Sequence, residues 1–159
     1  MSNAITAFAL LAERYCSWVA SPALSAAHDE ATARELLPEL YLAAHRLPEG
    51  TPAVPSSPAY PLPEYEHVRS RFRELSVGYY GDTFDPLVVP PEEATVSDLA
   101  DDLADIHRDL FRGLQLFRAG AHAAAAWQWR YHFVIHWGAH LVGALRALHH
   151  AWAQAHPPY

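Results

Sequence analysis

The feature that most constrains the fold is a long helical periodicity in the second half of the chain. Between residues 96 and 117, apolar side chains recur at steps of three and four: Leu99, Leu103, Ile106, Leu110, Leu114 and Phe117. Residues three and four apart share one face of an α-helix, so this spacing predicts a helix with one buried face. A similar pattern follows over residues 121–150, directly after Gly120. A connection this short predicts that the two helices pack antiparallel as a hairpin.

Three further helices are expected before this hairpin, so the expected fold class is all-α, a bundle of about five helices. Apolar residues at helical spacing predict helices over 5–20 and 25–47, and Pro63 in a first turn with Gly78 as a C-terminal cap predicts a helix over 63–77. No stretch alternates between apolar and polar residues clearly enough to indicate a strand, so no sheet is expected. The length of 159 residues fits a single helical domain spanning 1–159. Six prolines at about 48–63 indicate an extended loop within it.

Charge and composition argue against several classes of partner. The formal net charge is −7, and no basic stripe offsets it. Because such a chain repels phosphate backbones and anionic lipid, we expect no nucleic acid and no membrane as partners. No apolar run is long enough to span a bilayer. All eleven basic residues are Arg, which excludes lysine chemistry such as a Schiff base.

The origin and compartment of the protein are also predicted from composition. The absence of Lys beside many Ala and Pro residues is typical of a GC-rich bacterial genome. The single cysteine, Cys16, excludes an internal disulfide and a cysteine-based zinc cluster. Glu13 and Arg14 interrupt the apolar N-terminal stretch, unlike the apolar core of a secretory signal. We therefore expect a cytoplasmic location.

Acidic residues form a stripe beside the leucine face of residues 96–117. They are Asp98, Asp102, Asp105 and Asp109. Each directly precedes a residue of that face, so the stripe lies about 100° away, where a side chain can reach a neighbouring helix. Like charges three or four residues apart repel by roughly 0.2–0.5 kcal/mol per pair. Water and salt, Arg108 and Arg112, or a cation or histidine from the next helix could offset this repulsion.

The pattern over residues 121–150 predicts two adjacent apolar strips and a pair of histidines. The main strip comprises Trp127, Tyr131, Val134, Gly138, Leu141, Leu145, Leu148 and Trp152. The second comprises Trp129, Phe133, Trp137 and Ala144. His136 and His140 lie one turn apart at the edge of the second strip, whereas His132 is expected to point further outward. Two histidines four residues apart on one helix can chelate a metal ion.

These two helices together predict one candidate site. Asp102 and Asp105 with His136 and His140 would form a mixed nitrogen and oxygen site, suited to zinc, manganese or iron. A divalent metal is the cofactor that this interpretation requires. The alternative is a histidine–aspartate hydrogen-bond network that satisfies buried polar groups. Because the chain has no His-Glu-x-x-His motif and no repeated Glu-x-x-His motif, the network is the simpler interpretation.

Four short motifs on the same two helices are distinctive. They are Asp-Asp-Leu-Ala-Asp-Ile-His-Arg-Asp-Leu (101–110), Trp-Gln-Trp-Arg (127–130), His-Trp-Gly-Ala-His (136–140) and Ala-Leu-Arg-Ala-Leu-His (144–149). Together they resemble a bacterial family catalogued as domain of unknown function 5063. The resemblance covers about residues 5–150. It implies the helical fold, and it implies no activity, cofactor or substrate.

Two classes of function therefore stay open. The first, which the sequence favours, is a non-enzymatic binding or adaptor module for an unknown protein partner. It rests on the lack of a complete catalytic constellation and on the proline-rich loop and an aromatic loop at 79–91. The second is a metal-binding helical protein or a metal-dependent enzyme that uses the Asp/His site. A homodimer through an exposed apolar helix face is a further hypothesis.

Overall fold

The computed structural model describes residues 3–49, 59–83, 85–90 and 93–158. Its elements are α1 (Asn3–Ala20), α2 (Ala26–Ala44), α3 (Leu62–Arg71), β1 (Tyr79–Asp82), β2 (Thr95–Asp98), α4 (Leu99–Arg118), α5 (His122–His132), the π-helical segment η1 (Phe133–Trp137) and α6 (Gly138–Ala155). The last three run on as one helix of 34 residues. The predicted all-α fold class, with about five helices, is confirmed.

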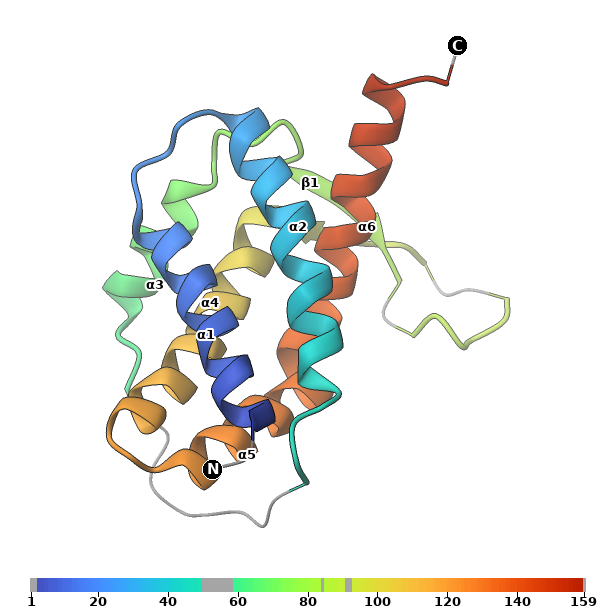
Figure 1. The fold of residues 1–159 in the computed structure, drawn as a ribbon. Helices are drawn as coiled ribbons and strands as arrows, with labels where there is room; N and C mark the ends of the chain where they lie inside the picture. Colours follow the sequence, from blue (N-terminus) through green and yellow to red (C-terminus); the bar gives the residue numbers. More distant parts are fainter. Residues whose placement is uncertain (1–2, 50–58, 84, 91–92, 159) are drawn as a thin grey trace.

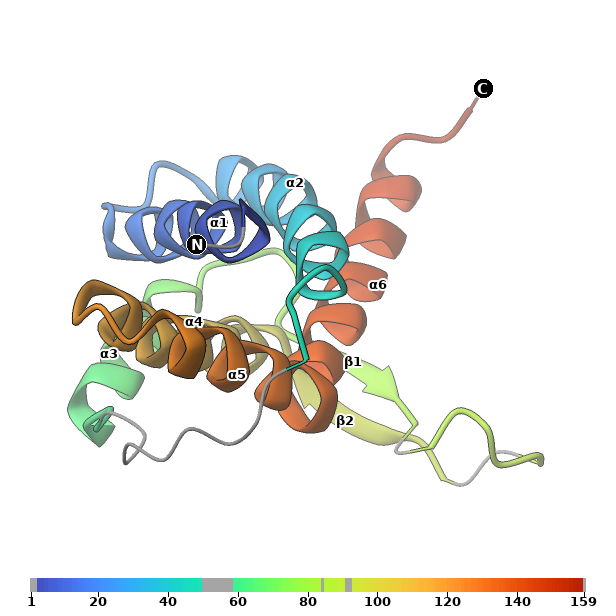
Figure 2. The same ribbon diagram turned by 60° about the horizontal axis from the view of Figure 1, so that its bottom comes forward.

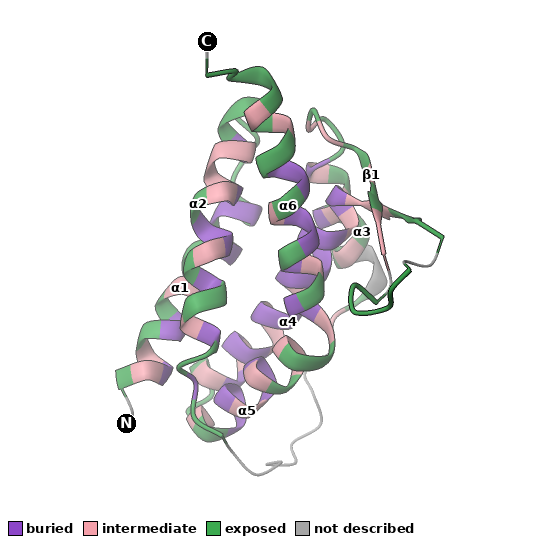
Figure 3. Ribbon diagram, turned by 90° about the vertical axis from the view of Figure 1, so that its right-hand side faces the viewer, coloured by how far each residue is buried: buried purple, intermediate pink, exposed green. Residues whose placement is uncertain are grey.

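The helix α4 lies at the centre of the bundle. It contacts α1, α3, α5 and α6. In Figures 1 and 2, α1 and α2 form one layer, α3, α4 and α5 form the other, and α6 crosses at one end. Buried residues line the inner faces of these helices (Figure 3). Leu99, Leu103, Ile106 and Leu110 of α4 are all fully buried, which confirms the predicted face.

Some sequence expectations fall on segments between the helices. Residues 50–58, which form most of the predicted proline-rich loop, lie outside the described residues. The same holds for Phe84 of the aromatic loop. Across the described part of the chain, none of the helices has both the length and the apolar character needed to cross a bilayer.

A small antiparallel sheet corrects the expectation that the chain has no strands. β1 pairs with β2, with Tyr79 opposite Asp98 and Asp82 opposite Thr95. Each strand has only four residues, too few for an alternating pattern to stand out in the sequence. The helix predicted from residue 96 therefore begins at Leu99, where Asp98 caps it by accepting the backbone N–H of Ala100 at 2.9 Å.

The last helix changes the face that it buries at η1. Leu141 and Leu148 of the predicted main strip are buried, but Tyr131 and Val134 of the same strip are 45% and 74% exposed. In η1 the backbone N–H of Gly138 donates to the carbonyl oxygen of Phe133, five residues earlier. A π-helical turn holds more residues than an α-helical turn, so it shifts the helical phase. The predicted main strip is therefore wrong at Tyr131 and Val134 and right from Gly138 to Leu148, whereas its last member, Trp152, is 42% exposed.

The close contact between α4 and α5 depends on Gly113. A Cβ at this position would overlap the indole ring of Trp129. That ring is fully buried and donates its N–H to the carbonyl oxygen of Leu110 at 3.0 Å. We expect Gly113→Ala to lower the free energy of unfolding by about 2–3 kcal/mol, through overpacking, in urea titrations. Gly78→Ala, where the described residues place no atom within 4 Å of the new Cβ, should change it by less than about 0.5 kcal/mol. Equal effects at both positions would contradict this account.

Candidate functional site

The aspartate stripe of α4 is buried against the last helix. Asp102, Asp105 and Asp109 are 4%, 7% and 1% exposed. They face His136 in η1 and His140 in α6, as the antiparallel hairpin requires. The structure thus brings together all four residues of the predicted site. It also adds Asp109, which the sequence placed in the stripe but not in the site.

His140 is held between two of these carboxylates. Its Nδ1 donates to Oδ1 of Asp102 at 2.7 Å, and its Nε2 lies 3.5 Å from Oδ2 of Asp105. The second oxygen of Asp102, Oδ2, accepts the hydroxyl of Tyr80 at 2.6 Å. Both oxygens of Asp102 are therefore engaged, and this carboxylate fixes the orientation of the His140 ring.

His136 is oriented in the same way by another carboxylate. Its Nδ1 donates to Oδ2 of Asp109 at 2.8 Å, and its Nε2 lies 3.2 Å from Nη2 of Arg108. A guanidinium group has donors only, so Nε2 accepts and the ring proton sits on Nδ1. The same Nη2 of Arg108 forms an ion pair with Oδ1 of Asp105 at 2.7 Å. The positive charge of Arg108 therefore lies between Asp105 and His136.

The two histidines and Asp105 form a compact set of metal-ligand atoms. One atom from each of Asp105, His136 and His140 lies within 4.8 Å of the others. The two imidazole rings are also adjacent, with centroids 4.7 Å apart. Because each Nδ1 atom is hydrogen-bonded to an aspartate, the Nε2 atoms are the ones available to a metal ion. A carboxylate behind each histidine is the arrangement that orients metal-binding histidines in proteins.

Burial governs the electrostatics of this cluster. Burial raises the pKa of Asp102 above its usual value, against the hydrogen bonds from His140 and Tyr80. It also raises the pKa of Asp105, against the charge of Arg108. Burial on its own would lower the pKa of His140, but the hydrogen bond to Asp102 and the charges of Asp105 and Asp102 raise it instead. Negative charge in the cluster is therefore costly unless a cation lies beside it.

The small sheet positions Tyr80, a residue that the sequence did not place in the site. Burial raises the pKa of Tyr80, so its hydroxyl stays protonated and donates to Asp102. The hydroxyl packs against α6 at Gly143, where a Cβ would lie 2.5 Å from it. Gly in a helix interior costs up to about 1 kcal/mol relative to Ala. Gly143 in the middle of a helix was thus a sequence signal for a close neighbour. It did not indicate that this neighbour is Tyr80.

Cavities open on two sides of the cluster. One of about 410 Å³ lies beside Asp102 and His140, against the sheet. Another of about 440 Å³ lies beside Asp105 and His136. Each is large enough for a small molecule. The cluster can therefore be reached from outside, although its aspartates are buried.

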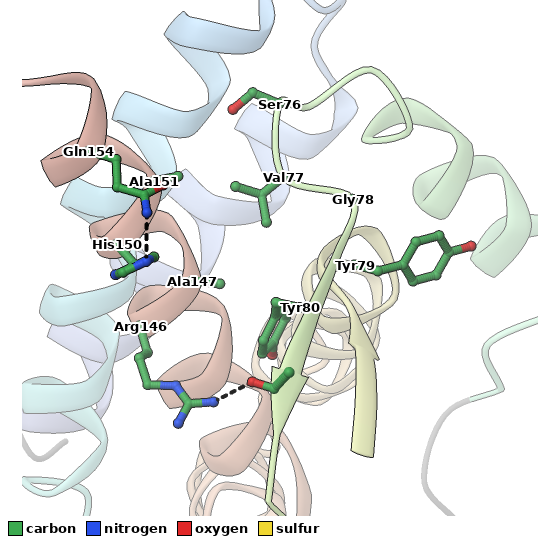
Figure 4. Close-up of a pocket in the computed structure, with 11 residues that line it drawn as sticks. Ser76, Val77, Gly78, Tyr79, Tyr80, Arg146, Ala147, His150, Ala151 and Gln154 are labelled. Carbon is green, nitrogen blue, oxygen red and sulfur yellow. Dashed lines mark hydrogen bonds between the residues drawn. The ribbon is translucent and has the colours of Figure 1, made fainter. Parts of the chain in front are cut away.

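A third cavity, of about 550 Å³, lies between β1 and α6 (Figure 4). In Figure 4, Tyr80 points toward α6 and Tyr79 points away from it. Arg146 closes one end, because its Nη2 donates to the carbonyl oxygen of Gly81 at 2.8 Å. Tyr80 therefore lines this cavity with its ring and contacts the Asp/His cluster with its hydroxyl.

Comparisons with known proteins agree with the fold and name no activity. A family model described as "Domain of unknown function (DUF5063)" matches residues 1–154. The crystal structure of protein BF1032 from Bacteroides fragilis is similar over 95% of this chain and 96% of that chain, with a TM-score of 0.77. The sequences are 23% identical, so this likeness shows the fold alone. No curated protein matches the chain.

Proposed function

The chain belongs to the DUF5063 family, whose description names no activity, and from its own residues we propose that it is a metal-binding helical protein. Asp105, His136 and His140 hold one divalent cation in this proposal. The observation that carries it is the convergence of these three side chains within 4.8 Å, with each histidine oriented by its own aspartate. Two imidazole nitrogens and one carboxylate suit Zn²⁺, Mn²⁺ or Fe²⁺.

The two aspartates and two histidines of the predicted site take different roles in this proposal. Asp102 orients His140 and does not ligate the metal, because its two oxygens already bind His140 and Tyr80. Asp109 does the same for His136. Three protein ligands leave coordination positions for water or a substrate, as in catalytic metal sites. The two adjoining cavities of about 410 and 440 Å³ give access to those positions.

Arg108 supplies the positive charge of the metal-free form. Its guanidinium contacts Asp105 at 2.7 Å and His136 at 3.2 Å, which are two of the three proposed ligands. A metal ion must therefore displace Arg108 from Nε2 of His136, whereas Oδ2 of Asp105, which faces His140, is not bound by Arg108. The side chain of Arg108 is 25% exposed, so it can move outward without unfolding α4. We expect Arg108→Ala to bind the metal more tightly than the unchanged protein, because it removes the competing cation.

The hydrogen-bond network is the competing explanation. The same contacts satisfy the buried polar groups without a metal, and Arg108 completes them. This explanation differs in what it predicts. It predicts that neither the unchanged protein nor Arg108→Ala binds the metal.

A melting experiment separates the two explanations. With Zn²⁺ or Mn²⁺ at about 100 times its Kd, the free energy of unfolding should rise by about 2.7 kcal/mol. In a domain of this size that raises Tm by roughly 5–10 °C. The shift should disappear in His140→Ala and persist in His149→Ala, which removes an exposed histidine of the same helix. No shift with either metal, together with no metal in the protein as isolated, would refute the proposal.

The adaptor function that the sequence favoured stays a prediction. The proline-rich segment on which it rests lies mostly outside the described residues. Capture of a reproducible protein partner from the native host would support it. The homodimer hypothesis likewise stays a prediction, for which light scattering of the purified protein is the measurement.

A further inference from the structure

The cavity of about 440 Å³ beside Asp105 and His136 is lined by two arginines. Arg108 and Arg112 lie one turn apart on α4, so their guanidinium groups share a face of the helix. Tyr60 and Tyr65 provide its aromatic wall. The guanidinium of Arg108 lies 5.5 Å from the ring centre of Tyr65. The cavity therefore combines two fixed positive charges with aromatic surface.

The donors of Arg112 are poorly satisfied by the described part of the chain, whereas Arg108 is held by Asp105 and His136. Arg112 donates no hydrogen bond to any residue in the described ranges, and its nearest carboxylate oxygen is Oδ1 of Asp109 at 3.9 Å. The Nε atoms of Arg108 and Arg112 are both buried without a hydrogen-bond partner among the residues that the structure describes. Like charges four residues apart on a helix also repel each other. A negatively charged group between them would relieve both costs.

We propose that Arg108 and Arg112 form a binding site for a small oxyanion, a carboxylate or a phosphate monoester group. A guanidinium presents its N–H groups as a planar fork that matches the oxygens of either group. The tyrosine hydroxyls are already engaged, Tyr60 with His107 at 2.6 Å and Tyr65 with Asp101 at 2.7 Å. The arginines are therefore the donors for the anion, and the tyrosine rings contact the remainder of the ligand.

The oxyanion site adjoins the proposed metal site through Arg108. A metal bound to Nε2 of His136 removes the contact of Arg108 with that ring, so Arg108 can turn toward the anion beside Arg112. An oxygen of the anion can also fill an open position on the metal. Metal and anion should therefore strengthen each other's binding, and by linkage the factor is the same in both directions. This coupling rests on the proposed metal site, whereas the contact with Arg112 does not.

Calorimetric titration with inorganic phosphate and with succinate, each with and without Mn²⁺, tests the inference. Arg112→Gln should weaken binding of the preferred anion about 10- to 100-fold, the effect of losing charge-assisted hydrogen bonds. Arg118→Gln is the matched control, because this exposed arginine of α4 pairs with Glu13 away from the cavity. The tighter of the two anions identifies the class of ligand.

The outcomes for the two sites are distinguishable. If Mn²⁺ binds and neither anion does, the oxyanion site is refuted and the metal site stands. If an anion binds with the expected loss in Arg112→Gln but neither Mn²⁺ nor Zn²⁺ binds, the metal site is refuted and the oxyanion site stands. Equal anion affinity in the unchanged protein and Arg112→Gln overturns the inference. Circular dichroism of Arg112→Gln shows whether the variant keeps its helices.

Discussion

Replacing Asp105 by Asn is expected to remove metal binding, whereas replacing Asp102 by Asn should weaken it only about 10- to 100-fold. Asp105 is the only carboxylate among the three clustered ligand atoms in the described part of the chain. Its loss leaves two histidines of one helix, with nothing from α4 to complete the site. Asp102 acts through the ring of His140, which it holds at 2.7 Å. Losing that bond frees the ring to rotate but leaves every ligand in place.

Competition of each variant with a coloured chelator measures this difference. Asp101→Asn is the control, because this aspartate of α4 is not among the clustered ligands and instead contacts Arg69 at 3.5 Å and accepts the hydroxyl of Tyr65 at 2.7 Å. Its metal affinity should equal that of the unchanged protein. Equal losses in Asp102→Asn and Asp105→Asn would contradict the division of roles. Both carboxylates would then ligate the metal, as the sequence pattern predicted.

The spacing of residues along α4 and the last helix was enough to predict which side chains meet. Asp102, Asp105, His136 and His140 are brought together because each pair lies at helical spacing on one face. Spacing alone does not say which oxygen faces which nitrogen. Asp102 binds Nδ1 of His140, whereas Asp105 lies on the side of the ligand atoms. This difference depends on side-chain rotamers and on the angle between the two helices. Those are set by packing, which no local pattern records.

The face buried by the last helix shows a second limit. His132 was expected to point outward, yet Gln128, one turn before it on the same helix face, is only 3% exposed. A fixed period of 3.6 residues cannot describe a helix whose phase changes at η1. No residue type in Phe133–Trp137 marks a π-helical turn in the sequence.

Tyr80 shows a third limit, which concerns short strands. Its contact with Asp102 depends on the pairing of β1 with β2, and each strand has four residues. Pairing of two short segments across a connection is a tertiary event, so neither segment signals it alone. The sequence placed the two tyrosines in a loop. The contact of Tyr80 with Asp102 follows only from the pairing of the two strands.

Removing the carboxylate of Asp29 should cause the largest loss of stability of any single change considered, about 3–5 kcal/mol for Asp29→Ala. Asp29 of α2 accepts Nη1 and Nη2 of Arg71, both at 2.8 Å, and the indole N–H of Trp18 at 3.0 Å. The side chains of Asp29 and Arg71 are only 4% and 10% exposed. The substitution leaves the charge of Arg71 and the donor of Trp18 without their shared partner. Three segments of the chain lose their common contact.

Urea titration of a double-mutant cycle measures this effect. Arg71→Met in the Asp29→Ala background should restore part of the lost stability, because it removes the unpaired buried charge. Glu39→Ala is the matched control, since it breaks the exposed pair of Arg14 and Glu39. That pair should contribute less than about 1 kcal/mol. A loss at Asp29 as small as the loss at Glu39 would contradict the account.

The pH dependence of stability provides an independent check on Asp29. The hydrogen bond from Arg71 lowers the pKa of this carboxyl below its usual value, against the effect of burial. A group whose pKa is lower in the folded state stabilises it fully above the unfolded pKa, about 3.9 for Asp. That contribution is lost as the pH falls through the folded pKa, where the carboxyl is protonated in both states. Acidification below about pH 4 should therefore destabilise the unchanged protein more than Asp29→Ala. Parallel stability curves for the two proteins in that range would show that Arg71 does not hold the carboxylate in its charged form.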